Sequence, residues 1–262
     1  MNNIKKVELH IHLDGSLRPE TVLELGKREG ILPKDYTLDQ IRKDLSVNSS
    51  DKTLVDYLKK FDMPIALMQS KKNIDRVAFE LVEDLAKEGT IYAEIRVAPI
   101  QHLKEGLTSN EVIEAILAGF KRAEDNYPIK VRLLLCAMRH LPPIESDFLI
   151  DMALKYKNQG VVGLDLAGDE AGFSALLFKD FFKKATEKNI PFTIHAGEAV
   201  GVDSIISAIE LGAKRLGHGV RAFEDENVME TLRQKEICLE CCPISNNDTH
   251  ALIQTILKKL IF

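Results

Sequence analysis

The sequence predicts a parallel α/β fold, either a (β/α) barrel or a doubly wound sheet. Short apolar runs rich in β-branched residues alternate along the chain with longer segments of helical period. Most of the short runs are almost continuously apolar, as expected of parallel strands that are covered on both faces. With 262 residues, of which 45% are hydrophobic, the chain is long enough to bury a large core.

Seven of the short apolar runs are predicted to be strands. They are residues 7–13, 91–99, 131–138, 161–168, 191–197, 214–219 and 237–243. The segments between them carry helix boundary signals. Pro19 suits the first turn of a helix that Gly30 ends, and Thr108 and Glu111 form a capping box for another helix. Residues 31–88 are predicted to form a larger helical insertion between the first two strands.

The composition argues against several classes of function. The net charge of −5 and the absence of a basic run argue against a nucleic-acid partner. No apolar segment is long enough to span a bilayer, and the polar start of the chain does not predict a signal peptide. We therefore expect a cytoplasmic protein without a membrane partner, whose four cysteines are reduced.

Four of the seven histidines lie in or at the ends of predicted strands. His10 and His12 stand one residue apart in "ELHIHLDG", so their side chains point to the same side of the strand. His195 and His218 end later strands, and the C-terminal ends of barrel strands meet at one mouth. A single histidine at a strand end is more often a hydrogen-bonded structural residue. Four that converge in this way instead predict a metal site with room for water.

Other polar groups follow the same strands. The stretch "LDLAGDE" places Asp165, Gly168, Asp169 and Glu170 at the end of the fourth predicted strand. Glu198 lies in the loop after "TIHAG". If the strands form a barrel, these groups belong to the mouth that holds the histidines.

The cysteines offer a competing metal site. "CLECC" contains C-x-x-C, which zinc-dependent nucleobase deaminases of another fold combine with H-x-E. Here the histidine motif is H-x-x-E and the order Pro-Cys-x-x-Cys is absent, so a buried, inert strand is the favoured interpretation of Cys238, Cys241 and Cys242. His102 and His140 have no comparable context, and we expect them in loops or on the surface.

Five motifs together resemble a known family. "ELHIHLDGSLRPET", "GLDLAGDE", "IHAGE", "RLGHG" and "CPISN" stand in the order and spacing of adenosine deaminases, the zinc-dependent branch of the amidohydrolase-type (β/α)8 barrels. The resemblance covers residues 5–247, and "LDGSLRPE" is closer to the adenosine branch than to the adenine- or AMP-deaminating relatives. It implies one domain over residues 1–262 with an α/β, (β/α)8 TIM-type barrel fold.

The resemblance also implies a role for each group. His10, His12 and His195 would bind one Zn²⁺, which lowers the pKa of a bound water to about 7. His218 would act beside this water as a general base or an electrostatic partner. Glu198 would protonate ring N1 of the purine, which requires a raised pKa.

Substrate contacts follow from the same motifs. His12 and Asp14 would bind the substrate, with Asp14 on a ribose hydroxyl, and the Gly168 backbone N–H would reach ring N3. The expected partner is a small purine nucleoside: adenosine or deoxyadenosine plus water would give inosine or deoxyinosine plus ammonia, a step of purine salvage.

The end of the chain departs from the family pattern. In the family, "CPISN" is followed by a helix and an eighth strand ending in "T-D-D-P", whose first aspartate is the fourth zinc ligand. Only seven strands are recognisable here, and Asp248 comes too early to match. We therefore expect an incomplete barrel, truncated at its C-terminus, with impaired activity. The alternatives are a non-catalytic remnant and an adenine or AMP deaminase of the same family.

Overall fold

The computed structural model describes residues 5–47 and 53–249. The chain divides into two compact units. The first takes its described residues from 1–48, 59–134 and 158–161, and the second from 49–58, 135–157 and 162–262. The division falls inside one strand, between Leu134 and Leu135. The single domain expected from the sequence stays a prediction.

All seven predicted strands are present. They are β1 (Lys6–His12), β2 (Thr90–Val97), β3 (Lys130–Met138), β4 (Val161–Ala167), β5 (Ile194–Ala196), β6 (Arg215–His218) and β7 (Cys238–Glu240). They form a four-stranded sheet of order β1-β2-β3-β4 and a three-stranded sheet of order β5-β6-β7. The pairs β1–β2, β5–β6 and β6–β7 are parallel, and a parallel bridge between Leu164 and Phe192 joins β4 to the segment before β5.

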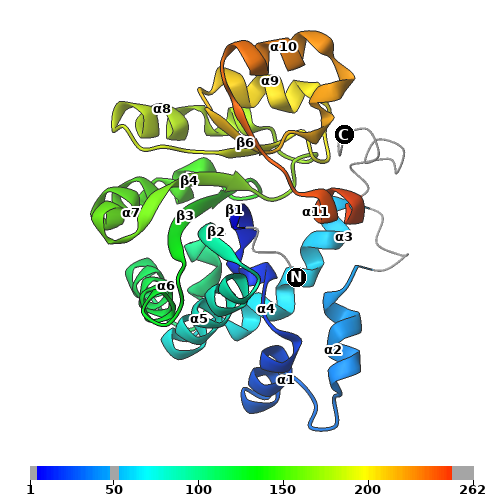
Figure 1. The fold of residues 1–262 in the computed structure, drawn as a ribbon, viewed down its shortest axis with the longest axis vertical. Helices are drawn as coiled ribbons and strands as arrows, with labels where there is room; N and C mark the ends of the chain where they lie inside the picture. Colours follow the sequence, from blue (N-terminus) through cyan, green and yellow to red (C-terminus); the bar gives the residue numbers. More distant parts are fainter. Residues whose placement is uncertain (1–4, 48–52, 250–262) are drawn as a thin grey trace. The chain divides into compact units, whose positions relative to one another are not determined.

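The order of the strands decides between the two predicted architectures. A doubly wound sheet reverses its strand order at a switch point. Within each of the two sheets the strands follow one another in the order of the sequence, as in a (β/α) barrel. Figure 1 labels β1, β2, β3 and β4 of the first sheet. The fold is therefore α/β of the barrel type, with seven strands among residues 5–47 and 53–249. The prediction for the end of the chain concerns residues 250–262, which lie outside the described residues.

Helices fill the segments between the strands. They are α1 (Pro19–Arg28), α2 (Leu38–Leu45), α3 (Leu54–Leu58), α4 (Asp62–Leu67), α5 (Lys71–Lys87), α6 (Ser109–Glu124), α7 (Phe148–Tyr156), α8 (Lys179–Glu187), α9 (Val202–Glu210), α10 (Glu226–Gln234) and α11 (Pro243–Asp248). The helices α2 to α5 occupy the predicted insertion at 31–88. None of the described helices is long and apolar enough to cross a membrane, and the cytoplasmic location stays a prediction.

Local sequence signals begin several of these helices. Pro19 is the first residue of α1. The predicted capping box of α6 is confirmed: the Thr108 side chain accepts the Glu111 backbone N–H, and the Glu111 side chain accepts the Thr108 N–H. Thr37 and Gln40 form a second capping box at the start of α2. Each box satisfies backbone donors that the first turn of a helix leaves without an intrahelical partner.

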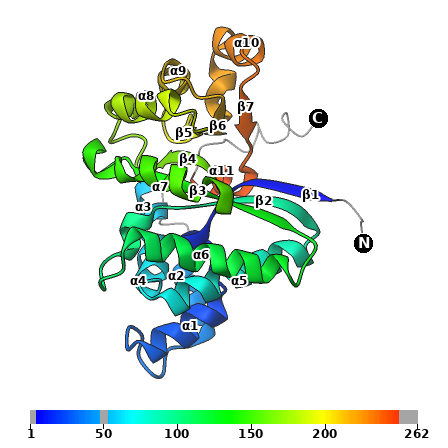
Figure 2. The ribbon, with the colours of Figure 1, turned by 90° about the vertical axis from the view of Figure 1, so that its left-hand side faces the viewer.

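A single glycine sets the distance between two helices of the first unit. Helices α5 and α6 lie side by side (Figure 2). A Cβ added at Gly119 of α6 would lie 2.5 Å from the carbonyl oxygen of Asp75 and 2.8 Å from the Cβ of Ala78, both on α5. Contacts that short do not occur between real atoms, so only glycine permits this approach. Val77 and Ile116 are among the apolar side chains that the two helices bury.

Aromatic packing dominates part of the core of the second unit. Phe178, Phe181 and Phe182 are buried where α8 begins. The ring of Phe182 lies 4.7 Å from that of Phe192, just before β5. Aromatic pairs at this spacing stabilise a fold beyond the apolar area that they bury. The cluster therefore fixes α8 against the segment that leads to His195.

Candidate active site

The first strand carries its two histidines on an irregular stretch. In the parallel pairing of β1 with β2, Glu8 lies opposite Ala93 and Ile11 opposite Ile95. Three steps along β1 thus match two steps along β2, so β1 holds one extra residue between Glu8 and Ile11. Such a bulge bends the strand and changes the direction of the side chains near it. His10 lies inside this bulge.

The rings of His10 and His12 are neighbours, as their spacing in the sequence predicts. Their centroids lie 5.6 Å apart and their planes are inclined by 62°. The ring of Phe61 packs edge-on against His12, with centroids 6.0 Å apart. A Cβ at Gly15 would lie 2.7 Å from the Phe61 ring, so Gly15 leaves the space that this ring occupies. The first unit therefore presents two adjacent imidazoles.

Asp14 lies beside a histidine that the sequence analysis misplaced. His102 was expected in a loop or on the surface, but it is fully buried in the 3-10 helix Pro99–His102. Its Nε2 lies 3.9 Å from Oδ2 of Asp14, and its Nδ1 lies 3.1 Å from the Met68 carbonyl oxygen. The short "APIQH" stretch has no periodicity that would have indicated burial.

Burial also changes the protonation of this pair. It raises the pKa of Asp14 to about 7 and lowers the pKa of His102 to about 4. Because a carbonyl oxygen can only accept, Nδ1 of the neutral His102 carries the proton. Asp14 Oδ1 and His102 Nε2 have no hydrogen-bond partner among the residues that the structure describes.

His195 is held by a carboxylate from the neighbouring strand. Its Nδ1 lies 3.1 Å from the carboxylate of Asp165, which is fully buried on β4. Asp165 also accepts the backbone N–H of Leu166 at 2.8 Å. With Nδ1 engaged, Nε2 is the nitrogen that His195 presents to other groups. A carboxylate bonded to the far ring nitrogen is the usual support of a metal-binding histidine.

Glu198 and His218 form a buried pair in the second unit. Oε2 of Glu198 lies 3.4 Å from Nε2 of His218, and both side chains are almost fully buried. Burial raises the pKa of Glu198 to about 7, although the positive charge of His195 opposes this rise. At neutral pH this carboxyl can therefore hold a proton or release it.

The tautomer of His218 is fixed from its other side. Its Nδ1 lies 2.6 Å from the amide oxygen Oδ1 of Asn246 in α11. With that oxygen as acceptor, Nδ1 carries the proton, and the lone pair of the neutral ring lies on Nε2, facing Glu198. His218 also has a φ of 63°, in the left-handed region that is uncommon for residues other than glycine. Backbone strain of this kind collects at functional sites.

Gly168 and Arg139 shape the end of β4. Gly168 has a φ of 106°, which a residue with a side chain rarely adopts. The buried guanidinium of Arg139 donates to the carbonyl oxygens of Phe173 and His195, each at 2.6 Å. Arg139 therefore joins the loop after β4 to the strand that carries His195.

The prediction that Cys238, Cys241 and Cys242 lie in a buried strand is wrong. Cys238 and Cys241 are exposed and Cys242 is half-buried, whereas a buried strand was expected. The strand β7 is only three residues long, lies at the end of its sheet, and is followed at once by α11. A short terminal strand cannot bury both of its faces, and this explains the exposure.

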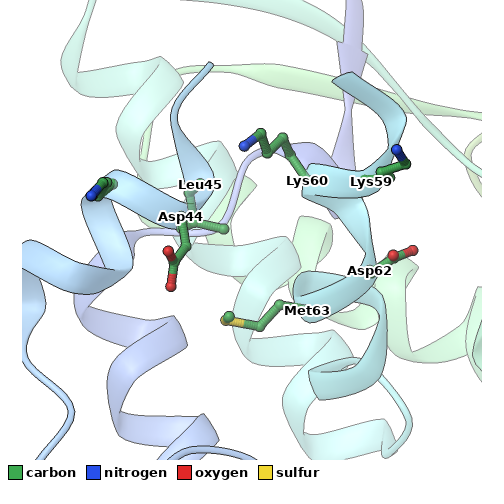
Figure 3. A pocket seen from close by; sticks show the side chains of 7 residues that line it. Asp44, Leu45, Lys59, Lys60, Asp62 and Met63 are labelled. Atoms are coloured by element: carbon green, nitrogen blue, oxygen red, sulfur yellow. The ribbon is translucent and has the colours of Figure 1, made fainter. Parts of the chain in front are cut away.

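The first unit also contains a cavity that none of these groups lines. It has a volume of about 350 Å³ and lies between α2 and the segment where α4 begins (Figure 3). Its lining residues are Lys43, Asp44, Leu45, Lys59, Lys60, Asp62 and Met63. None of the predicted site residues is among them, so the cavity does not contribute to the candidate site.

Each unit thus gathers part of the predicted set. The first unit holds His10, His12 and Asp14, and the second holds Gly168, His195, Glu198 and His218. Among the described residues that contact them or their loops are Phe61, His102, Arg139, Asp165, Glu170 and Asn246. Asp165 and Glu170 stand in "GLDLAGDE", the motif that also carries Gly168, and Asn246 ends the motif "CPISN", so the sequence offered a signal for these three. It offered none for His102 or Arg139.

Known proteins resemble this chain over most of its length. A family model described as "Adenosine deaminase" matches residues 5–256. The adenosine deaminase of Clostridium perfringens (strain SM101 / Type A) is 44% identical over 249 residues, which cover 94% of this chain and 75% of that protein. The adenosine deaminase of Mycobacterium marinum is 43% identical over 266 residues, covering 94% of this chain and 73% of that protein.

Solved structures share the fold. An adenine deaminase from Arthrobacter aurescens superimposes with a TM-score of 0.84 at 24% identity, over 94% of this chain and 74% of that one. An Arabidopsis N6-mAMP deaminase gives a TM-score of 0.82 at 28% identity, over 95% of this chain and 75% of that one. A cog1816 amidohydrolase from Burkholderia ambifaria, with bound Zn, gives 0.80 at 23% identity, over 90% of this chain and 64% of that one.

Proposed function

Since this chain belongs to the adenosine deaminase family, we propose that it hydrolyses adenosine or deoxyadenosine to inosine or deoxyinosine and ammonia. The observation that carries the proposal is the buried pair of Glu198 and His218, whose Oε2 and Nε2 lie 3.4 Å apart. Hydrolytic deamination requires one group that gives a proton to the ring and one that takes a proton from water. Glu198 and His218 supply these two groups side by side.

The proposed reaction includes one Zn²⁺ per chain, with His10 and His12 of the first unit and His195 of the second as ligands. The residues fit this ion. The imidazoles of His10 and His12 are adjacent, and Asp165 holds Nδ1 of His195 so that Nε2 is the ligand atom. A bound zinc would supply a water whose pKa is near 7, and hence a nucleophile at neutral pH. The bound Zn of an amidohydrolase with the same fold supports this choice.

The protein's own groups would then move the protons. Glu198 would donate its proton to ring N1, which makes C6 of the purine more electrophilic. His218 would accept a proton from the attacking water at Nε2, while Asn246 keeps Nδ1 protonated. That proton would then pass to the leaving amino group, and the C6 hydroxyl would return its remaining proton to the Glu198 carboxylate. The tetrahedral C6 intermediate thereby collapses to inosine and ammonia, and both side chains recover their starting protonation states.

Asp14 and Gly168 would set the substrate preference, together with His12. The Gly168 backbone N–H would donate to ring N3. Asp14 Oδ1, which is buried, would accept a hydrogen bond from a ribose hydroxyl. In its ionised form this carboxyl group would disfavour a 5′-phosphate, because the two negative charges would repel each other in a buried site. We therefore place the nucleoside before the nucleotide as the substrate.

Deamination of adenine or of an AMP derivative is the second candidate. It is favoured by two of the solved structures with this fold, an adenine deaminase and an N6-mAMP deaminase. Comparison of kcat/KM for adenosine, adenine, AMP and N6-methyl-AMP separates the candidates. Our proposal expects adenosine to be the preferred substrate by tenfold or more, about 1.4 kcal/mol of differential binding in the transition state.

The direct test is ammonia release from adenosine by the purified 262-residue chain with stoichiometric zinc. In keeping with the impaired activity expected from the sequence, we expect ammonia release that is detectable but slower than the ordinary range for enzymes, about 1–10³ per second. His195→Ala should abolish it, whereas His140→Ala, which replaces an exposed histidine, should not. A folded, zinc-loaded chain that releases no ammonia from any of the four compounds would mean that it binds zinc or nucleoside without catalysis, and would refute the proposal.

A further inference from the structure

A buried carboxylate outside the catalytic set holds the loop on which Glu198 stands. We propose that Glu170 is a positioning residue for the deamination: its carboxylate fixes the backbone of residues 197–200 and thereby keeps the Glu198 side chain against His218. The inference rests on the proposed function, which assigns the acid role to Glu198. The hydrogen bonds of the Glu170 carboxylate go to residues 197–200 and to Ser204, and not to His218 or the proposed metal ligands.

The contacts of Glu170 are unusually many for one side chain. Its Oε1 accepts hydrogen bonds from the Gly197 N–H at 2.6 Å and from the Ser204 hydroxyl at 2.5 Å. Its Oε2 accepts hydrogen bonds from three backbone N–H groups: Glu198 at 3.1 Å, Ala199 at 2.5 Å and Val200 at 3.0 Å. Four consecutive backbone donors therefore converge on one carboxylate. Glu170 is 4% exposed, so water does not compete for these donors.

The local backbone explains why a carboxylate belongs at this position. Gly197 has a φ of 70°, which turns the chain so that successive N–H groups point to the same side. Such a nest of backbone N–H groups binds an anion. The helix α9 begins at Val202, two residues after the last of these N–H groups, and the N-terminal end of the helix adds a partial positive charge. Its N-cap residue, Gly201, has no side chain to supply a cap.

The Glu170 side chain contacts this loop from the end of a different strand. Glu170 follows β4, whereas residues 197–200 follow β5, so its contacts lie 27 to 30 residues apart in the sequence. The neighbouring cation supports the same arrangement, because Arg139 donates to the carbonyl oxygens of Phe173 and His195. The end of β5 is thus fixed on two sides: Arg139 holds a carbonyl before Gly197, and Glu170 holds the N–H groups after it.

The test removes the Glu170 carboxylate by mutation and then adds formate as a carboxylate from solution. In Glu170→Ala we expect kcat for adenosine to fall at least tenfold, because Glu198 loses its fixed position, with KM changed less than threefold. Sodium formate should restore kcat in a saturable manner, because its carboxylate can occupy the vacated nest. Sodium chloride at the same ionic strength should not restore it. Wild-type kcat should not respond to formate.

Two further variants serve as controls. Glu170→Gln fills the same space but offers an amide NH₂ where a backbone N–H must donate, so we expect it to be impaired and not rescued by formate. Glu187→Gln replaces an exposed glutamate of α8 and should leave kcat unchanged. If Glu170→Ala does not fold, Ser204→Ala removes one hydroxyl contact from Glu170 and should lower kcat by a few-fold.

Hydrogen exchange separates this inference from the proposed function. The amides of residues 197–200 should be protected in the wild-type protein, exchange faster in Glu170→Ala, and regain protection in formate. This measurement does not depend on turnover. If the wild-type chain is inactive, the proposed function is refuted. The exchange measurement then still decides whether Glu170 holds the loop. A folded Glu170→Ala protein with wild-type kcat, or with these amides protected as before, would overturn the inference.

Discussion

Replacement of Glu198 by glutamine tests the acid role proposed for this residue. The amide has nearly the same shape and can donate a hydrogen bond, but it cannot release a proton at neutral pH. General acid catalysis typically contributes 10²–10⁴-fold to a rate, so we expect kcat to fall by about that factor. The assay is ammonia release from pH 5 to 9, at saturating adenosine for kcat and at subsaturating adenosine for kcat/KM, with Glu187→Gln as the control on the surface of α8.

The magnitude of the pH effect follows from the burial of Glu198. Burial raises the pKa of this carboxyl from 4.5 to about 7. At pH 7 about half of the molecules then hold the proton, against roughly one in 300 for a carboxyl with a pKa of 4.5. Above pH 7, kcat/KM should therefore decline about tenfold per pH unit in the wild-type protein. This decline should be absent from Glu198→Gln.

The raised pKa of Glu198 also predicts that the stability of the protein depends on pH. A salt-bridged carboxylate makes a protein more stable as the pH rises, whereas Glu198 should make it less stable. Between pH 4.5 and about 7 the folded protein holds the Glu198 proton and the unfolded chain does not, so the free energy of unfolding falls as the pH rises. The loss is at most about 3 kcal/mol, because a tenfold difference in proton affinity between the folded and unfolded protein is worth about 1.36 kcal/mol. Glu198→Gln avoids this loss and should be more stable than the wild-type protein at pH 8, and similar to it near pH 4.

Urea denaturation of both proteins in the presence of a chelator measures this difference. Two results would refute the reasoning. One is equal stability of the two proteins at pH 8, which would mean that burial does not raise the pKa of Glu198. The other is a Glu198→Gln protein whose activity still declines above pH 7, which would assign the decline to another group.

Three further predictions address the support of the site and of the fold. Asn246→Ala removes the acceptor that fixes the tautomer of His218 and should lower kcat about 10–100-fold, as expected for the loss of a hydrogen bond worth about 1.5–3 kcal/mol; an unchanged kcat would contradict the tautomer argument. Asp165→Asn should weaken zinc binding about 10–100-fold, because His195 loses its supporting carboxylate; competition with a chromophoric chelator measures this, and equal affinity would exclude the support role. Thr108→Ala should lower the free energy of unfolding by about 1 kcal/mol through the loss of a helix cap, without a change in kcat; thermal denaturation and the ammonia assay check the two parts.

Much of the fold was predictable because its signals are local. Continuous apolar runs located all seven strands, and the pair of Thr108 and Glu111 marked the start of α6 where the structure has it. The choice between a barrel and a doubly wound sheet was not local, because both architectures use the same buried strands and covering helices. The spatial order of the strands decided it. The resemblance in five motifs had already indicated the answer.

For the candidate site too, some properties follow from the local sequence and others from the tertiary structure. The sequence by itself determined which groups are predicted to carry the chemistry, since the alternation of a strand puts His10 beside His12, His195 and His218 lie at strand ends, and Glu198 follows in a loop. Only the tertiary structure decided how those groups are held and charged. The burial that raises the pKa of Glu198, the contact of Asn246 with His218 and the four N–H groups on Glu170 all join segments that are distant in the sequence or depend on the surrounding core. A residue type states which bonds are possible, and the packed fold determines which partner is within reach and whether water competes for it.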